Sequence, residues 1–122
     1  MSIDAAALVR EVRAVANEHP RHVYDGYTED GRKRCVYTRN GAPSCLIGHA
    51  ALRLGVSLDQ LRDWDGRTLT GIEDVLAAEG VDRESSEVQW LDHVQFEQDH
   101  RRSWGEAVRF VDELFRTWNR GA

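Results

Sequence analysis

The strongest structural signal in this sequence is the spacing of large apolar residues near its C-terminal end. They recur every third or fourth position, at Trp104, Val108, Val111, Phe115 and Trp118. This period places side chains on one face of an α-helix. Ser103 followed by Glu106 is a capping box, which indicates where the helix begins. A helix with one apolar face is stable only when other elements cover that face, so we expect helix packing to dominate the fold.

The N-terminal part of the chain predicts one helix followed by a small hairpin. The helix ends before Pro20, because proline cannot continue it. Its core face is formed by Leu8, Val12, Val15 and Ala16. Residues 22–24 and 34–38 are rich in β-branched and aromatic side chains and flank a polar stretch. This pattern predicts two antiparallel strands, with Val23 and either Cys35 or Val36 facing inward.

The most apolar helix is expected directly after a turn at Asn40 and Gly41. Ser44 is expected to cap this helix, Cys45 lies on its first turn and Gly55 ends it. Its apolar character predicts a central place in the core. The remaining helices are expected at 57–64, at 72–79 with Thr70 as the cap, and from Ser85 or Ser86 onward.

The chain as a whole is expected to form a single globular domain, residues 1–122. A length of 122 residues suits one domain, and a hydrophobic content of 41% is enough to build a core. The fold class that we predict is α+β and mostly α, with about six helices and one small antiparallel β-hairpin after the first helix. No apolar run approaches the ~18 residues of a membrane span, and no export signal is recognisable. We therefore predict a cytoplasmic protein.

Cys45 is the strongest candidate for chemistry. A thiol at a helix N-terminus lies near the positive end of the helix dipole, which favours the reactive thiolate. The candidate bases are His22, from a strand, and His49, one turn further along the same helix. This set would make a small cysteine-dependent hydrolase or transferase, which is the alternative function. A free cysteine is more often a small buried hydrophobe, and we favour that interpretation.

Two groups of residues are candidates for binding. The amides of Gln95 and Gln98 can read a ligand or a peptide backbone, or they can join two helices, which we favour. Trp90 lies off the apolar stripe of its helix and is expected to be partly exposed. With Phe110 and Leu114 it widens the apolar surface, so these three residues are candidates for an interface. The alternative is that these residues are buried inside the protein, because the central helices of a compact domain can be covered on both faces.

Charge and ligand spacing exclude several classes of protein. With 21 acidic against 16 basic residues the net charge is -5, which does not attract nucleic acid. The short basic clusters are Arg32 to Arg34 and His100 to Arg102, and we interpret them as solvated loops. The cysteines and histidines lack the paired spacing of a zinc site, so neither a metal nor a cofactor is expected.

Four segments carry a resemblance to known proteins, namely residues 43–50, 54–56, 90–99 and 104–108. They resemble small intracellular proteins encoded by actinobacteria and their phages. The resemblance supplies no catalytic residues. It implies an accessory protein of phage or mobile-element origin that binds a host or phage protein. We therefore predict non-enzymatic protein binding, with a homodimer as a further option.

Overall fold

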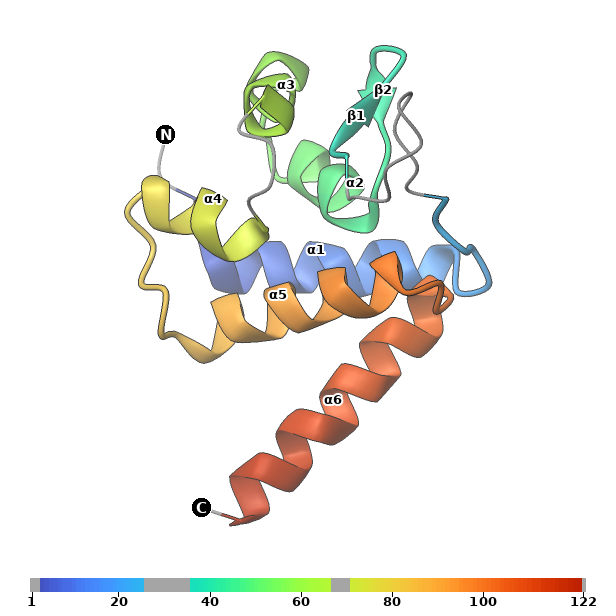
Figure 1. Ribbon diagram of the computed structural model, residues 1–122, viewed down its shortest axis with the longest axis vertical. Helices are drawn as coiled ribbons and strands as arrows, with labels where there is room; N and C mark the ends of the chain where they lie inside the picture. Colours follow the sequence, from blue (N-terminus) through green and yellow to red (C-terminus); the bar gives the residue numbers. More distant parts are fainter. Residues whose placement is uncertain (1–2, 26–35, 67–70, 122) are drawn as a thin grey trace.

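The computed structural model describes residues 3–25, 36–66 and 71–121, with side chains described as far as residue 117. Within these ranges the chain forms six helices and one two-stranded antiparallel sheet after the first helix (Figure 1). The elements are α1 (Ala5–Glu18), β1 (Thr38–Arg39), β2 (Ala42–Pro43), α2 (Leu46–Arg53), α3 (Leu58–Gly66), α4 (Ile72–Ala78), α5 (Ser86–Asp99) and α6 (Trp104–Gly121). The predicted mostly helical α+β fold is thereby confirmed.

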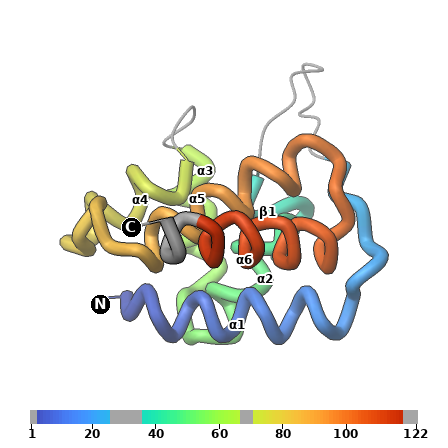
Figure 2. Tube along the Cα trace, turned by 90° about the horizontal axis from the view of Figure 1, so that it is seen from below, coloured from blue at the N-terminus to red at the C-terminus, as the bar shows by residue number. Residues whose placement is uncertain are grey.

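Helix α1 makes its most extensive contacts with α2, α5 and α6. Its predicted core face is confirmed, since Leu8, Val12 and Val15 are all buried. Figures 1 and 2 show the end of α1 beside the start of α6, and from there α6 diverges from α5 toward the C-terminus. The core face of α1 is therefore covered by α2, α5 and α6.

The sheet forms a tight hairpin around Asn40 and Gly41. Thr38 pairs with Pro43 in an antiparallel register across this turn. Asn40 has a φ of 55° and Gly41 a φ of 75°. Two consecutive positive φ angles match the twist of a two-residue hairpin, and asparagine and glycine adopt them at low cost. The turn was recognised from the sequence, but its two short strands were not.

The predicted pairing of residues 22–24 with 34–38 is wrong for the described residues, which leave out 34 and 35. Val23 instead forms an isolated antiparallel bridge with Ser103, directly before α6. Its side chain is 48% exposed and does not face inward. The buried residue is Tyr24, whose hydroxyl bonds to the backbone of the second segment. A side-chain contact therefore joins two segments that were expected to form a strand ladder.

Helix α2 begins one residue later than expected. Cys45, rather than Ser44, is the N-cap, and its Sγ accepts a hydrogen bond from the backbone N of Gly48 at 3.3 Å. Gly55 follows the helix with a φ of 105°, as expected for a glycine that ends a helix. The thiol thus takes the capping role that is usual for serine.

Two of the later helices, α5 and α6, begin with a serine side-chain cap, whereas α4 does not. Ser85 caps α5 by accepting a hydrogen bond from the backbone N of Val88, and Ser103 accepts one from Glu106 in the predicted box before α6. Thr70, the predicted cap of α4, lies outside the described residues. Gly71 stands at that N-cap position and supplies no side-chain bond. The start of α4 must therefore be satisfied by another part of the chain.

Candidate functional site

The thiol of Cys45 is fully buried. Its exposed fraction is 0%, and Sγ is engaged in the cap of α2. Cys45 is not among the residues that line the pocket formed around the predicted bases. A reagent would reach Sγ only after the first turn of α2 opened. This burial favours the structural interpretation of the cysteine over a catalytic one.

Slow alkylation of Cys45 is the expected consequence. In a Cys35→Ser variant, which leaves one thiol, iodoacetamide should modify the native protein at least roughly a hundredfold more slowly than the urea-unfolded chain. The reason is that opening a packed core element costs several kcal/mol. Mass spectrometry over time gives both rates. Equal rates in the native and unfolded protein would show that the thiol is accessible.

The predicted bases His22 and His49 do come together, around the indole of Trp104. The ring centroids of His22 and Trp104 are 4.4 Å apart, and those of His49 and Trp104 are 5.5 Å apart. A third imidazole, His19, lies 6.4 Å from the same indole. We call these three histidines the histidine cluster. His19 was not singled out, although its spacing of three from His22 near a helix end was available as a signal.

The histidine cluster lines an open pocket of about 500 Å³. Asp25, Arg39 and Ser44 are among its other lining residues. Burial lowers the pKa of His49, and the positive charges of its neighbours lower the same pKa further. His49 is therefore neutral at pH 7. In the described part of the chain, no three His, Cys, Asp or Glu side chains are placed to hold a metal ion.

The two glutamines join helices, as favoured from the sequence. Gln98 is fully buried, and its Oε1 accepts a hydrogen bond from the backbone N of Leu46 at 2.7 Å. Gln95 is 5% exposed, and its Oε1 accepts from the backbone N of Ile72 at 2.8 Å. The Nε2 of Gln95 donates to the hydroxyl of Tyr37 at 3.0 Å. Helix α5 thereby completes the N-terminal caps of both α2 and α4.

Trp90 is buried, so the expectation of partial exposure is wrong. Its exposed fraction is 4%, and Nε1 donates to Oδ1 of Asp112 at 2.8 Å. The guanidinium of Arg13 lies 4.7 Å from the indole centroid and also donates to Asp112. Burial by itself raises the pKa of Asp112, but the hydrogen bonds from Arg13 and Trp90 outweigh it and lower that pKa. Helices α1 and α6 thus supply polar partners that a lone helix lacks.

The other predicted interface residues, Phe110 and Leu114, lie on α6. Phe110 is 41% exposed, and the guanidinium of Arg102 lies 4.3 Å from its ring centroid. Leu114 is half-buried. Phe96, which was not predicted, is 57% exposed and stacks on the imidazole of His100 at 4.0 Å. Both exposed aromatic rings are therefore partly covered by side chains of the same protein.

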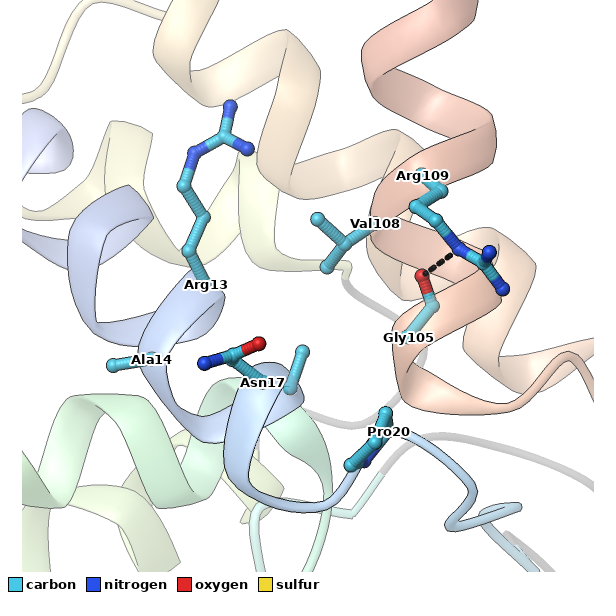
Figure 3. A pocket seen from close by; sticks show the side chains of 8 residues that line it. Arg13, Ala14, Asn17, Pro20, Gly105, Val108 and Arg109 are labelled. Atoms are coloured by element: carbon cyan, nitrogen blue, oxygen red, sulfur yellow. Dashed lines mark hydrogen bonds between the residues drawn. The ribbon is translucent and has the colours of Figure 1, made fainter.

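A groove runs between α1 and the first turns of α6 (Figure 3). It has a volume of about 490 Å³ and is lined by Arg13, Ala14, Ala16, Asn17, Pro20, Gly105, Val108 and Arg109. The two helices run antiparallel, since Pro20 bonds to Gly105 at one end and Arg13 bonds to Asp112 further along. The floor of this α1–α6 groove consists of small apolar groups, so an apolar side chain of a partner would fit there.

Arginines flank both walls of the α1–α6 groove. Arg109 donates from Nε to the carbonyl of Gly105 at 3.4 Å, and no carboxylate in the described ranges pairs with it. Arg13 is fixed by Asp112 on the opposite wall. Arg10 is exposed and lies on the same side of α1, because residues three positions apart are neighbours on a helix surface. From the sequence alone these arginines look like an ordinary solvated helix face.

Comparisons with protein-family models, with curated proteins and with solved structures find no match to this chain. Within the described ranges, none of the helices has both the length and the apolar character needed to cross a membrane. The α1–α6 groove and the histidine cluster are therefore the features of the molecule that bear on its function.

Proposed function

We propose that this protein is a non-enzymatic binding module whose α1–α6 groove takes an acidic amphipathic helix of a partner protein. The observation that carries the proposal is an apolar floor between two walls that bear arginines. An amphipathic helix places apolar side chains in such a groove and its flanking side chains against the rims. The resemblance noted above is consistent with a host or phage protein as the partner.

Charge complementarity favours an acidic partner. The chain carries a net charge of -5, so a groove lined by Arg13 and Arg109 is a local exception. Asp112 balances the charge of Arg13, whereas Arg109 pairs with no carboxylate in the described ranges. Because charges beyond about 8 Å are screened at physiological ionic strength, Arg109 supplies the local positive charge that favours an acidic partner. Because Asp112 already holds Arg13 in place, little side-chain entropy is lost there on binding.

The lining of the α1–α6 groove supports binding rather than catalysis. Its polar side chains are two arginines and Asn17, which bind anions and amides but supply neither a nucleophile nor a general base at pH 7. The thiol of Cys45 is buried in the core. A cysteine-dependent reaction therefore has no observation in its favour, and we do not propose one.

Two synthetic helical peptides test this function. They share one apolar face, which is flanked by glutamates in the first peptide and by lysines in the second. We expect the acidic peptide to bind in fluorescence anisotropy, with an affinity that falls as salt is added, and the basic peptide to bind at least about tenfold more weakly, a difference of about 1.4 kcal/mol. Arg109→Glu should weaken binding of the acidic peptide by a similar factor.

Arg62→Glu is the matched control, because it makes the same charge reversal on the exposed surface of α3. It should leave the affinity unchanged. Equal binding of both peptides, or equal losses in the two variants, would refute the proposal. Sedimentation equilibrium tests whether a second copy of this chain occupies the groove instead. A dimer that Arg109→Glu dissociates would assign the α1–α6 groove to that second copy and refute the proposal of an acidic partner helix.

A further inference from the structure

The histidine cluster surrounds the residue with which α6 begins. Trp104 is 2% exposed, and its ring is the common neighbour of His19, His22 and His49. Its indole N–H is buried and has no hydrogen-bond partner among the described residues. The ring of Trp104 therefore packs against three imidazoles, and histidine is the side chain whose ordinary pKa lies nearest to neutral pH.

Two backbone hydrogen bonds also fix the start of α6 to the segment that follows α1. The N–H of Trp104 donates to the carbonyl of His22, and the N–H of Gly105 donates to the carbonyl of Pro20, both at 2.9 Å. Figures 1 and 2 show these two segments side by side. Pro20 and Gly105 also line one end of the α1–α6 groove. The histidine cluster and the α1–α6 groove thus meet at one place, where residues 20–22 bond to residues 104 and 105. We call this contact the joint.

We infer that the histidine cluster is a pH-sensitive latch, which holds the start of α6 against residues 20–23 at neutral pH and releases it in mildly acidic solution. Release would displace one wall of the α1–α6 groove and lower its affinity for a partner. The loss of affinity rests on the proposed function of the groove, whereas the pH-dependent release of α6 does not depend on that function.

The charges around the joint explain why protonation would open it. Among the described residues, the titratable and charged side chains near Trp104 and His49 are His19, His22, Asp25, Arg39 and Arg53, with Glu18 paired to Arg53 and Glu106 bonded to Ser103. Within this set the two arginines face two carboxylates, Asp25 and Glu18. Protonation of His49 adds a positive charge to a half-buried site that already faces Arg53, and like charges repel more strongly where water is partly excluded. The N-terminus of α6 repels these cations as well.

The direction of the pH effect follows from His49. Burial lowers its pKa, and the positive charges of His19, His22 and Arg53 act in the same direction. The unfolded or released state therefore takes up a proton more readily than the closed state. Stability from this group is complete above the ordinary histidine pKa of about 6.5 and falls as the pH drops from there through the lowered pKa of the folded protein.

Hydrogen exchange of single amides tests the latch in the full-length protein. Protection of the Trp104 and Gly105 amides, relative to Val94 in the core of α5, should fall about tenfold from about pH 7.5 to about pH 5.5, a range that spans the histidine pKa. The triple variant His19→Gln, His22→Gln, His49→Gln should keep its protection at the lower pH. His100→Gln, which lies outside the histidine cluster, should behave as the wild type.

Binding of the acidic peptide at the same two pH values tests the coupling. Its glutamates stay charged there, since their pKa is about 4.3. We expect affinity to fall about tenfold at the lower pH in the wild type and to persist in the triple variant. If that variant does not fold, His22→Gln, which alters an exposed side chain, replaces it and should reduce the effect. Failure of the peptide to bind at either pH would refute the proposed function and leave the exchange result valid, whereas pH-independent protection in the wild type would refute the latch.

Discussion

Replacing Gly48 with alanine is expected to lower the free energy of unfolding by at least about 2 kcal/mol. A Cβ at this position in α2 would lie 2.4 Å from the carbonyl oxygen of Tyr37, where no heavy atom can be accommodated. The obstacle is backbone, which cannot rotate away, so α2 or residue 37 must shift. Such overpacking costs about 1–3 kcal/mol or more. Exchanging glycine for alanine in a helix otherwise gains about 1 kcal/mol, so the sign of the result is diagnostic.

Urea denaturation gives the measurement, with a lower midpoint at an unchanged slope as the expected result. Gly66→Ala is the matched control. It changes a helical glycine whose added Cβ would have no neighbour within 4 Å among the described residues, so stability should be unchanged or slightly higher. An increase in stability for Gly48→Ala, comparable with that of the control, would show that α2 does not lie this close to Tyr37.

Replacing Gln98 with methionine is expected to lower the free energy of unfolding by about 2 kcal/mol. Methionine keeps most of the volume but removes the oxygen that accepts from the backbone N of Leu46. That N–H is buried at the start of α2, and a buried donor without a partner costs about 1–3 kcal/mol. The loss of stability therefore arises from a helix that is distant from Gln98 in the sequence.

Gln89→Met on the same helix separates the hydrogen bond from general effects of the substitution. The side chain of Gln89 makes only an exposed bond to the carbonyl of Arg83, so its loss should cost less than about 0.5 kcal/mol. Urea midpoints of the two variants give the comparison. Similar small losses for Gln89→Met and Gln98→Met would mean that water or another group satisfies the start of α2.

The candidate site was only partly predictable. His22 and His49 were identified from the sequence, as possible partners of Cys45, and the structure brings them together around Trp104. The thiol is buried in the cap of α2. The arginine-lined α1–α6 groove was not foreseen, because each of its walls resembles a solvated helix face until the two helices are placed side by side.

Local features of the fold were determined by the sequence itself. The apolar stripes of α1 and α6, the caps at Ser85 and Ser103, and the turn at Asn40 and Gly41 all follow from interactions within a few residues. Such interactions depend on side-chain chemistry and spacing, which can be read directly from the chain. The mostly helical α+β fold class follows from them.

Only the tertiary structure decided which side chains of different helices contact one another. Gln98 caps a helix that begins 52 residues earlier, and Trp90 is buried because Asp112 of α6 accepts its N–H. The histidine cluster and the α1–α6 groove arise where the end of α1 meets the start of α6. Helical periodicity indicates which face of a helix is buried, but not which other helix covers it or at what angle. Contacts between distant segments depend on that angle, so they appear only when the helices are packed together.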